Sequence, residues 1–205
     1  MTLVAVACEN VDYDGAVFLE LLARLWGPVE PWETPYRFNG RKAVLKHLPT
    51  FLGFAADAHL RHSLVAIDND GGARRCPEHE DQHRIEDQAS DPDDGCAVCC
   101  VEHVIPGEWR DPARRYCVAV PVQTLETWLL HLRGAPALTP TPEQVYSRTK
   151  LKKLFYGESK PPVATRRELV LVTLRTPDAM ERLRALRSFR HFEAQVAAWP
   201  RPEER

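Results

Sequence analysis

The sequence predicts an α/β fold, in which a mostly parallel sheet is flanked by helices and followed by a helical C-terminal part. Short apolar runs of strand length alternate with longer segments of helical periodicity, which is the pattern of strands joined by crossover helices. The short runs are apolar at successive positions, as strands covered on both faces are. A chain of 205 residues, 44% of them hydrophobic, is long enough to bury one sizeable core.

Three strands and five helical segments follow from these patterns. The strands are expected at Leu3–Cys8, Ser63–Ile67 and Tyr116–Val122. The chain is expected to be mostly helical from Pro142 onward. In this part the clearest helical segments are Met180–Leu186 and Phe189–Trp199, and the earlier helical segments are Gly15–Trp26, Arg41–Leu60 and Thr124–Leu132.

Individual residues mark where these helices begin, bend and end. Asp14 is the expected N-cap of the first helix, and Gly27 is expected to end it. Pro49 is expected to bend the second helical segment or to divide it in two. Thr124 is the expected capping residue of the third, and Pro200 ends the last.

Residues 71–115 interrupt the alternation of strands and helices. They begin with two glycines, show no clear periodicity, and carry eight acids against one arginine within 76–94. A stretch of this length without a core of its own is either disordered or held by something else. The predicted organisation is an α/β domain over 1–140, interrupted by an expected zinc-binding insertion at 71–115, and a helical basic region over 141–205 packed on the same domain.

The insertion contains cysteines and histidines at the spacing of zinc ligands. Cys76 and His79 form a C-x2-H pair, and Cys96 and Cys99 form a C-x2-C pair after a gap of 16 residues. Thiolate and imidazole suit a structural Zn²⁺, which would hold a polar segment that lacks a core. Unpaired cysteines on a flexible loop and a redox C-x-x-C motif are the other interpretations. Three further side chains are alternative zinc ligands: His83, Cys100 and His103.

Acidic residues follow all three predicted strands. Glu9 follows the first strand, and Asp68 and Asp70 follow the second. Glu126 lies just after the third. Because the carboxyl ends of parallel strands lie at one edge of a sheet, the four carboxylates are expected to converge, and a hard cation such as Mg²⁺ or Mn²⁺ would relieve their repulsion. Taken singly, D-N-D-G-G is also compatible with a simple turn, and Glu9 with a solvated loop acid.

The order of these motifs resembles the Toprim domain of topoisomerases, primases and OLD-type nucleases. The resemblance rests on Glu9 in V-A-C-E-N-V-D-Y-D-G and on Asp68 and Asp70 in L-V-A-I-D-N-D-G. More specifically, the chain resembles small stand-alone Toprim proteins of the RloB-like and OLD-related kind. Their later blocks are similar to V-P-V-Q-T-L-E-T-W-L-L and S-F-R-H-F in this sequence.

The sequence departs from the family pattern in three places. Asn10 stands where a glycine commonly follows the first glutamate. Asp14 occupies roughly the position of a second acid in OLD-like proteins, and Asp12 is a competing candidate. The cysteine-containing segment 71–115 is not part of the usual Toprim core.

The resemblance implies a Rossmann-like Toprim core and metal-dependent chemistry at phosphodiester bonds. Carried over to this sequence, Glu9, Asp68 and Asp70 hold Mg²⁺ or Mn²⁺, and Glu126 is a further ligand or orients the attacking water. Trp128 and Leu129 are expected to be core residues of the helix that positions Glu126. The resemblance also implies defence against phage or foreign DNA beside an ABC-type ATPase, which must be a separate protein because this chain has no G-x-x-x-x-G-K-[ST] phosphate loop.

The C-terminal half is strongly basic, although the formal net charge of the chain is −2. Between residues 148 and 190, twelve Lys and Arg stand against four acids. Such a group can neutralise several phosphates, while a solvated helical face is the alternative interpretation. The residues expected to contact DNA or RNA are Lys150, Lys152, Lys153, Lys160, Arg166 and Arg167.

The sequence therefore predicts a metal-dependent nuclease of the Toprim type. The alternative is a non-catalytic, zinc-stabilised nucleic-acid-binding or regulatory subunit of an ATPase complex. A third hypothesis is a catalytic metal finger around His79, His83, Cys96 and Cys99. No uncharged apolar run approaches the roughly 20 residues of a membrane span, and the start has no basic n-region, so a cytoplasmic protein without membrane contact is expected. The sequence is also compatible with a homo-oligomer.

Overall fold

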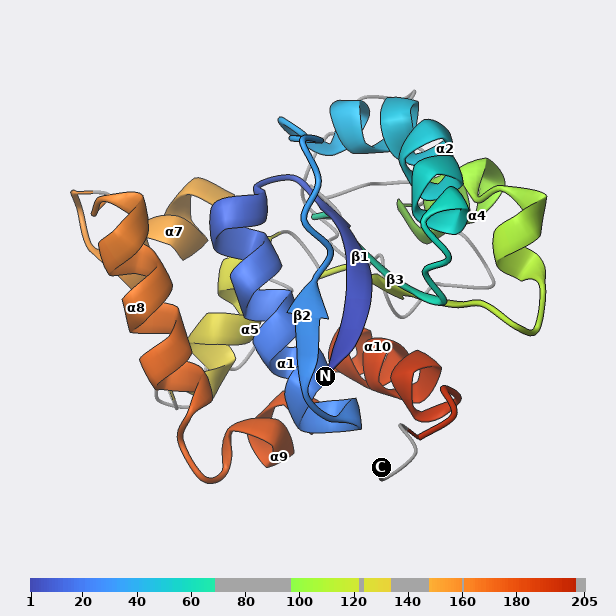
Figure 1. Cartoon of the computed structure of the whole chain (residues 1–205). Helices are drawn as coiled ribbons and strands as arrows, with labels where there is room; N and C mark the ends of the chain where they lie inside the picture. Colours follow the sequence, from blue (N-terminus) through green and yellow to red (C-terminus); the bar gives the residue numbers. More distant parts are fainter. Residues whose placement is uncertain (69–96, 122–123, 134–147, 160, 202–205) are drawn as a thin grey trace. The chain divides into compact units, whose positions relative to one another are not determined.

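The structure is a computed structural model that describes residues 1–68, 97–121, 124–133, 148–159 and 161–201 (Figure 1). The chain divides into two compact units. The first unit comprises Met1–Ile67, Cys100–Ala119 and His191–Arg205. The second comprises Asp68–Cys99 and Val120–Arg190. The helices α4 (Ala97–Val104) and α10 (Arg187–Ala197) each contain one of the points where the chain passes between the units.

The first unit is built on a parallel sheet with the strand order β2-β1-β3-β4 among the described residues. Its strands are β1 (Thr2–Cys8), β2 (Val29–Pro31), β3 (His62–Ala66) and β4 (Arg115–Ala119). Cys8 lies opposite Ala66, and Ala66 lies opposite Ala119, so β1, β3 and β4 end level with one another. The predicted α/β class and the three predicted strands are confirmed.

Two long helices cover the sheet of the first unit. They are α1 (Ala16–Trp26), which follows the π-helical turn η1 (Val11–Gly15), and α2 (Arg41–Asp57). In Figure 1, α1 and α2 lie on opposite sides of β1. Two crossovers of the same hand, which is usually the right hand, produce this arrangement, because α1 connects β1 to one neighbour and α2 returns the chain to the other side.

The ends of α1 correct one prediction and confirm another. Asp14 is not the N-cap, because it lies inside η1, whose own N-cap is Asn10. The Asn10 side chain accepts a hydrogen bond from the Tyr13 N–H at 3.2 Å. Gly27 ends α1 as predicted, with a φ of 137° that favours glycine. The second predicted helical segment forms the one helix α2, with Pro49 inside it.

Three elements of the fold were not expected from the sequence. The strand β2 is short and contains Pro31, which an edge strand tolerates. The helix α4 and the 3-10 turn η2 (Gly107–Arg110) lie in the segment 71–115, so the expectation that this segment lacks periodicity is wrong from residue 97 onward. Trp109 of η2 is buried, and its indole N–H donates to the Leu52 carbonyl at 2.9 Å.

The exposed edge of β4 is closed by a side chain. The Val118 N–H donates to Gln195 Oε1 at 2.9 Å, and Gln195 Nε2 donates to the Val118 carbonyl at 3.0 Å. This pair reproduces the hydrogen bonds that a further strand would make. The first unit thereby protects a sheet edge that would otherwise offer free peptide groups to another chain.

An aromatic cluster encloses His62 at the beginning of β3. The imidazole lies 4.7 Å from the Trp26 ring and 5.0 Å from the Trp199 ring, measured between centroids. Burial, followed by the positive charges of Arg115 and Arg61, lowers the pKa of His62 from its ordinary 6.5 to about 4. The native protein therefore holds this imidazole neutral at pH values where an unfolded chain would protonate it.

We expect the stability of the protein to rise between pH 4 and pH 6.5 because of His62. In this window the unfolded state binds the extra proton, so unfolding is favoured as the pH falls. The contribution is about 2 kcal/mol once solvent screening of the partly exposed ring is allowed for. Urea unfolding across this range should show a weaker pH dependence for His62→Phe than for the wild type, and equal slopes would contradict the assignment.

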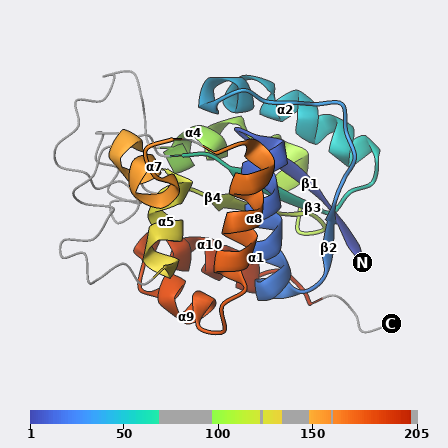
Figure 2. The same cartoon turned by 90° about the vertical axis from the view of Figure 1, so that its left-hand side faces the viewer.

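The second unit is helical in the part that the structure describes. Its helices are α5 (Leu125–Leu132), α7 (Arg148–Tyr156), α8 (Val163–Leu174), α9 (Ala179–Arg184) and the first turn of α10. In Figure 2, α5 lies between α7 and α9. The predicted helices in these segments are confirmed.

The helix α5 is the centre of the second unit. Trp128 and Leu129 are buried, as predicted. The Trp128 indole N–H donates to the Ser188 hydroxyl at 2.9 Å, and its ring meets the Phe189 ring edge-on at 5.3 Å. At the end of the helix, Arg133 donates to the Phe155 carbonyl at 2.7 Å. These contacts fix the position of α5 within its unit.

No helix in the described ranges is long and apolar enough to cross a membrane.

Candidate functional site

Glu126 is a buried carboxylate in the first turn of α5. Glu126 exposes only 3% of its surface to solvent. Its Oε2 accepts a hydrogen bond from the hydroxyl of Thr124, the buried N-cap residue. No Lys, Arg or His of the described residues forms an ion pair with Glu126. A buried carboxylate is costly unless a counter-charge compensates it, which makes Glu126 a candidate site residue.

Asp68 reaches the same helix end from a distant part of the sequence. Its Oδ1 accepts a hydrogen bond from the Leu125 N–H at 3.0 Å. Thr124 makes no side-chain hydrogen bond to the helix backbone, because its hydroxyl is directed to Glu126. Asp68 therefore takes the capping role that was predicted for Thr124. The result is that the structure brings Asp68 and Glu126, two of the predicted site residues, to the first turn of α5.

Glu9 lies in the first unit, directly after β1. The buried Cys8 thiol next to it has a raised pKa, chiefly because of burial, and the carboxylates of Asp14 and Glu9 raise it further. A Cβ at Gly15 would lie 3.3 Å from the Cys8 sulfur, so glycine allows η1 to close onto β1. Asp14 and Glu9 thus share the surroundings of Cys8. Single π-helical turns of this kind are rare and frequently occur at functional sites.

The predicted carboxylates are distributed over both units. Glu9 belongs to the first unit, and Asp68 and Glu126 belong to the second. Asp70 lies outside the described residues. The carboxylate oxygens of Asp68 and Glu126 are the donors that Mg²⁺ and Mn²⁺ prefer. In the described part of the chain, no group of three or more His, Cys, Asp or Glu is placed to hold a metal ion, so these two donors would need further ligands.

The predicted zinc ligands fall mainly outside the described residues. Cys76, His79 and Cys96 lie there, as does the alternative His83. Cys99 is half-buried on α4. Ala97 and Val98, the two residues between Cys96 and Cys99, lie on the same helix α4 as Cys99. The two other alternative ligands, Cys100 and His103, also lie on α4, where the Cys100 sulfur accepts a hydrogen bond from Arg41 at 3.8 Å.

The residues predicted to contact nucleic acid lie on α7 and α8, except Lys160, which is outside the described residues. Lys150 and Lys153 are exposed on α7, and Lys152 is half-buried. Lys153 forms an exposed ion pair with Glu158 at 2.9 Å. Exposed pairs of this kind contribute little to stability, so the lysine can exchange its partner for a phosphate.

The two predicted arginines of α8 differ in their surroundings. Arg167 is exposed. Arg166 is half-buried, with its guanidinium 5.9 Å from the centre of the Tyr156 ring on α7. Burial raises the pKa of Tyr156, and the charge of Arg166 opposes that rise. Arg166 therefore has a structural contact within its unit, whereas Arg167 is the arginine presented to solvent.

Sequence reasoning did not identify Thr124 as a partner of Glu126. The T-x-E spacing of Thr124 and Glu126 was the available signal, but threonine before a helix ordinarily indicates a cap. Comparisons of the chain with protein-family models, curated proteins and solved structures gave no match.

Proposed function

We propose that this protein is a divalent-metal-dependent nuclease of the Toprim type, which hydrolyses phosphodiester bonds of DNA or RNA. The observation that carries the proposal is the buried carboxylate of Glu126, which has a hydroxyl donor and no basic partner among the described residues. A site of this kind suits a cation better than it suits solvent. The order of acids after the strands, which resembles the Toprim pattern, supports the same chemistry.

The roles of the site residues follow from their contacts. Asp68 and Glu126 would hold Mg²⁺ or Mn²⁺, while the Leu125 N–H orients the first carboxylate and the Thr124 hydroxyl orients the second. The bound cation would supply positive charge to the phosphate and lower the pKa of bound water. Glu9 and Asp70 stay predicted metal ligands on the Toprim-like sequence order alone.

Substrate binding is assigned to the basic side chains of the second unit. Lys150, Lys153 and Arg167 are exposed on α7 and α8, where their charges can contact phosphates. A structural Zn²⁺ held by the cysteine- and histidine-containing segment is part of the proposal. A role in defence against phage or foreign DNA, in the cytoplasm and beside a separate ABC-type ATPase, is also part of the proposal, as the resemblance implies.

A cleavage assay on the full chain tests the proposed function. We expect degradation of single-stranded or double-stranded DNA or of RNA with Mg²⁺ or Mn²⁺, and none with EDTA. Asp68→Asn should lower the rate by about 100-fold or more, because the amide keeps the hydrogen bond to Leu125 but loses the charge that binds metal.

Glu168→Gln on α8 is the matched control, since it removes an exposed acid of the same unit and should leave the rate unchanged. Cleavage by Asp68→Asn at the wild-type rate would overturn the proposal. So would the absence of cleavage of every substrate with either metal, tested with the protein alone and with its ATPase partner. That second result would favour the non-catalytic subunit.

A further inference from the structure

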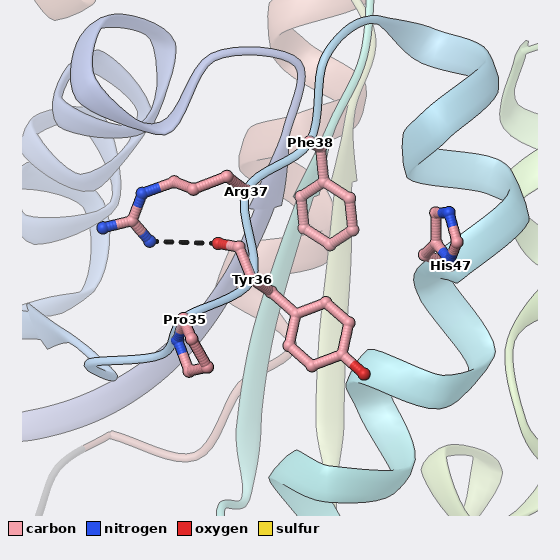
Figure 3. A pocket seen from close by; sticks show the side chains of 5 residues that line it. All are labelled: Pro35, Tyr36, Arg37, Phe38 and His47. Atoms are coloured by element: carbon pink, nitrogen blue, oxygen red, sulfur yellow. Dashed lines mark hydrogen bonds between the residues drawn. The ribbon is translucent and has the colours of Figure 1, made fainter.

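A cavity of about 340 Å³ lies in the first unit, beside the N-terminal half of α2. It is lined by Pro35, Tyr36, Arg37, Phe38 and His47. Figure 3 shows the rings of Tyr36 and Phe38 on the chain that precedes α2, with His47 across from them on the helix. The volume is at the lower end of the roughly 300–1,000 Å³ of small-molecule pockets. The cavity therefore suits one small, flat group better than a folded partner.

The aromatic wall of this cavity is held in a fixed orientation. The Tyr36 ring lies nearly parallel to the Phe38 ring at 6.2 Å, and it meets the Phe51 ring edge-on at 5.7 Å. Phe38 and Phe51 are buried, so both anchor Tyr36 to the core, while Tyr36 itself is half-buried. A rigid aromatic ring with part of its surface accessible is the kind of platform on which nucleobases stack.

The segment that forms the cavity is uniformly basic. Residues 34–56 contain four Lys and Arg and no acid. Arg37 lines the cavity, but its guanidinium donates to the Thr34 carbonyl at 2.8 Å and to the Tyr36 carbonyl at 3.0 Å, and Figure 3 shows it directed away from the two rings. Lys46 and His47 are exposed on α2. An aromatic wall beside basic side chains fits a ligand that combines a flat ring with an anion.

The cavity segment is joined to the residue after β1. Gly40, which precedes α2 and has a φ of 83°, donates its N–H to the Glu9 carbonyl at 3.5 Å. The backbone of the segment that carries Tyr36 and Phe38 is therefore tied to one of the carboxylate residues of the proposed nuclease. The cavity is thus connected to Glu9, a predicted metal ligand of the proposed nuclease. A nucleic acid is therefore the occupant that these contacts favour.

We propose that this cavity binds one unpaired nucleotide of a single-stranded nucleic acid, with its base against Tyr36 and its phosphate near the exposed Lys46. The proposal rests on the proposed nuclease function and names its substrate class as single-stranded or locally unpaired DNA or RNA. Because stacking on a ring does not read base edges, the cavity binds without strong sequence preference.

Binding of a short fluorescein-labelled single-stranded DNA or RNA, measured by anisotropy in EDTA, tests the proposal without catalysis. Tyr36→Phe should bind as the wild type does. Tyr36→Leu keeps apolar bulk but has no π face, and should bind between about 5-fold and 150-fold more weakly. Lys46→Gln should reduce the slope of log affinity against log salt by about 0.7. Arg24→Gln on α1, outside the cavity, is the matched charge control and should leave the slope unchanged.

Photocrosslinking with a bromouracil-containing strand should label residues 34–47. Thermal unfolding of Tyr36→Leu tests whether the variant is folded. If it is not folded, the crosslink to the wild-type protein is the deciding measurement. Wild-type affinity in folded Tyr36→Leu, or crosslinks only outside residues 34–47, would overturn the cavity assignment even if the protein cleaves nucleic acid. Tyr36-dependent binding without any metal-dependent cleavage would support the cavity and overturn the nuclease proposal alone. Tyr36-dependent binding of an acidic peptide in place of nucleic acid would overturn the cavity assignment.

Discussion

Replacement of Glu126 by glutamine is expected to abolish metal-dependent cleavage while leaving the protein folded. Glutamine has nearly the same shape and can still accept the hydrogen bond from Thr124, but it lacks the charge that holds a cation. We expect the cleavage rate to fall by about 100-fold or more, since losing even an outer partner of a metal ligand typically costs 10–100-fold. Initial rates with Mg²⁺ and with Mn²⁺ measure this effect.

The stability of the same variant separates a functional role from a structural one. In EDTA, the free energy of unfolding of Glu126→Gln should equal or exceed that of the wild type, because the substitution removes a costly buried charge that has no basic partner among the described residues. Urea unfolding measures it. A variant that cleaves at the wild-type rate would contradict the role assigned to Glu126. A variant that is both inactive and strongly destabilised would show that the residue is needed for folding instead.

Replacement of Trp128 by alanine is expected to destabilise the protein by about 3–5 kcal/mol. The side chain is 1% exposed, its ring contacts Phe189, and its indole N–H donates to Ser188. Alanine would leave a cavity and remove the hydrogen bond. The shift of the urea unfolding midpoint, at an unchanged slope, measures the loss.

Two smaller changes divide this effect into its parts. Trp128→Phe keeps a ring against Phe189 and removes the indole donor, so it should cost less than alanine does. Ser188→Ala removes the acceptor and should cost about 1–3 kcal/mol, because the buried indole N–H loses its partner. A cost below about 1 kcal/mol for Trp128→Ala would contradict the central place of α5 in its unit.

The parts of the fold that the sequence predicts are those with a strong local pattern. The strands β1, β3 and β4 are continuous apolar runs, and α5 is apolar around most of its surface. The strand β2 has three residues, two of them exposed, so its sequence carries no apolar signal. The helix α4 did carry one, because Ala97, Val98 and Val101 are buried at helical spacing, but the acidic run before them obscured it.

The candidate site divides in the same way between local and distant effects. A carboxylate after a strand can be recognised from the sequence, which is why Asp68 and Glu126 were singled out. The cap that Asp68 provides to α5 could not be predicted, because its hydrogen bond to Leu125 joins residues far apart in the chain. Likewise, Asn10 displaces Asp14 as a cap because the N–H groups of η1 converge on it, which only the folded turn reveals.

The most direct test of the proposed metal site is a titration with Mn²⁺, followed by the electron paramagnetic resonance signal of the free ion. We expect saturable binding to the wild type in the absence of nucleic acid. Glu126→Gln and Asp68→Asn should each weaken this binding by about tenfold or more, whereas Glu168→Gln should not. Mn²⁺ binding that is absent from the wild type, or equally strong in all four proteins, would contradict the assignment of these two carboxylates as metal ligands.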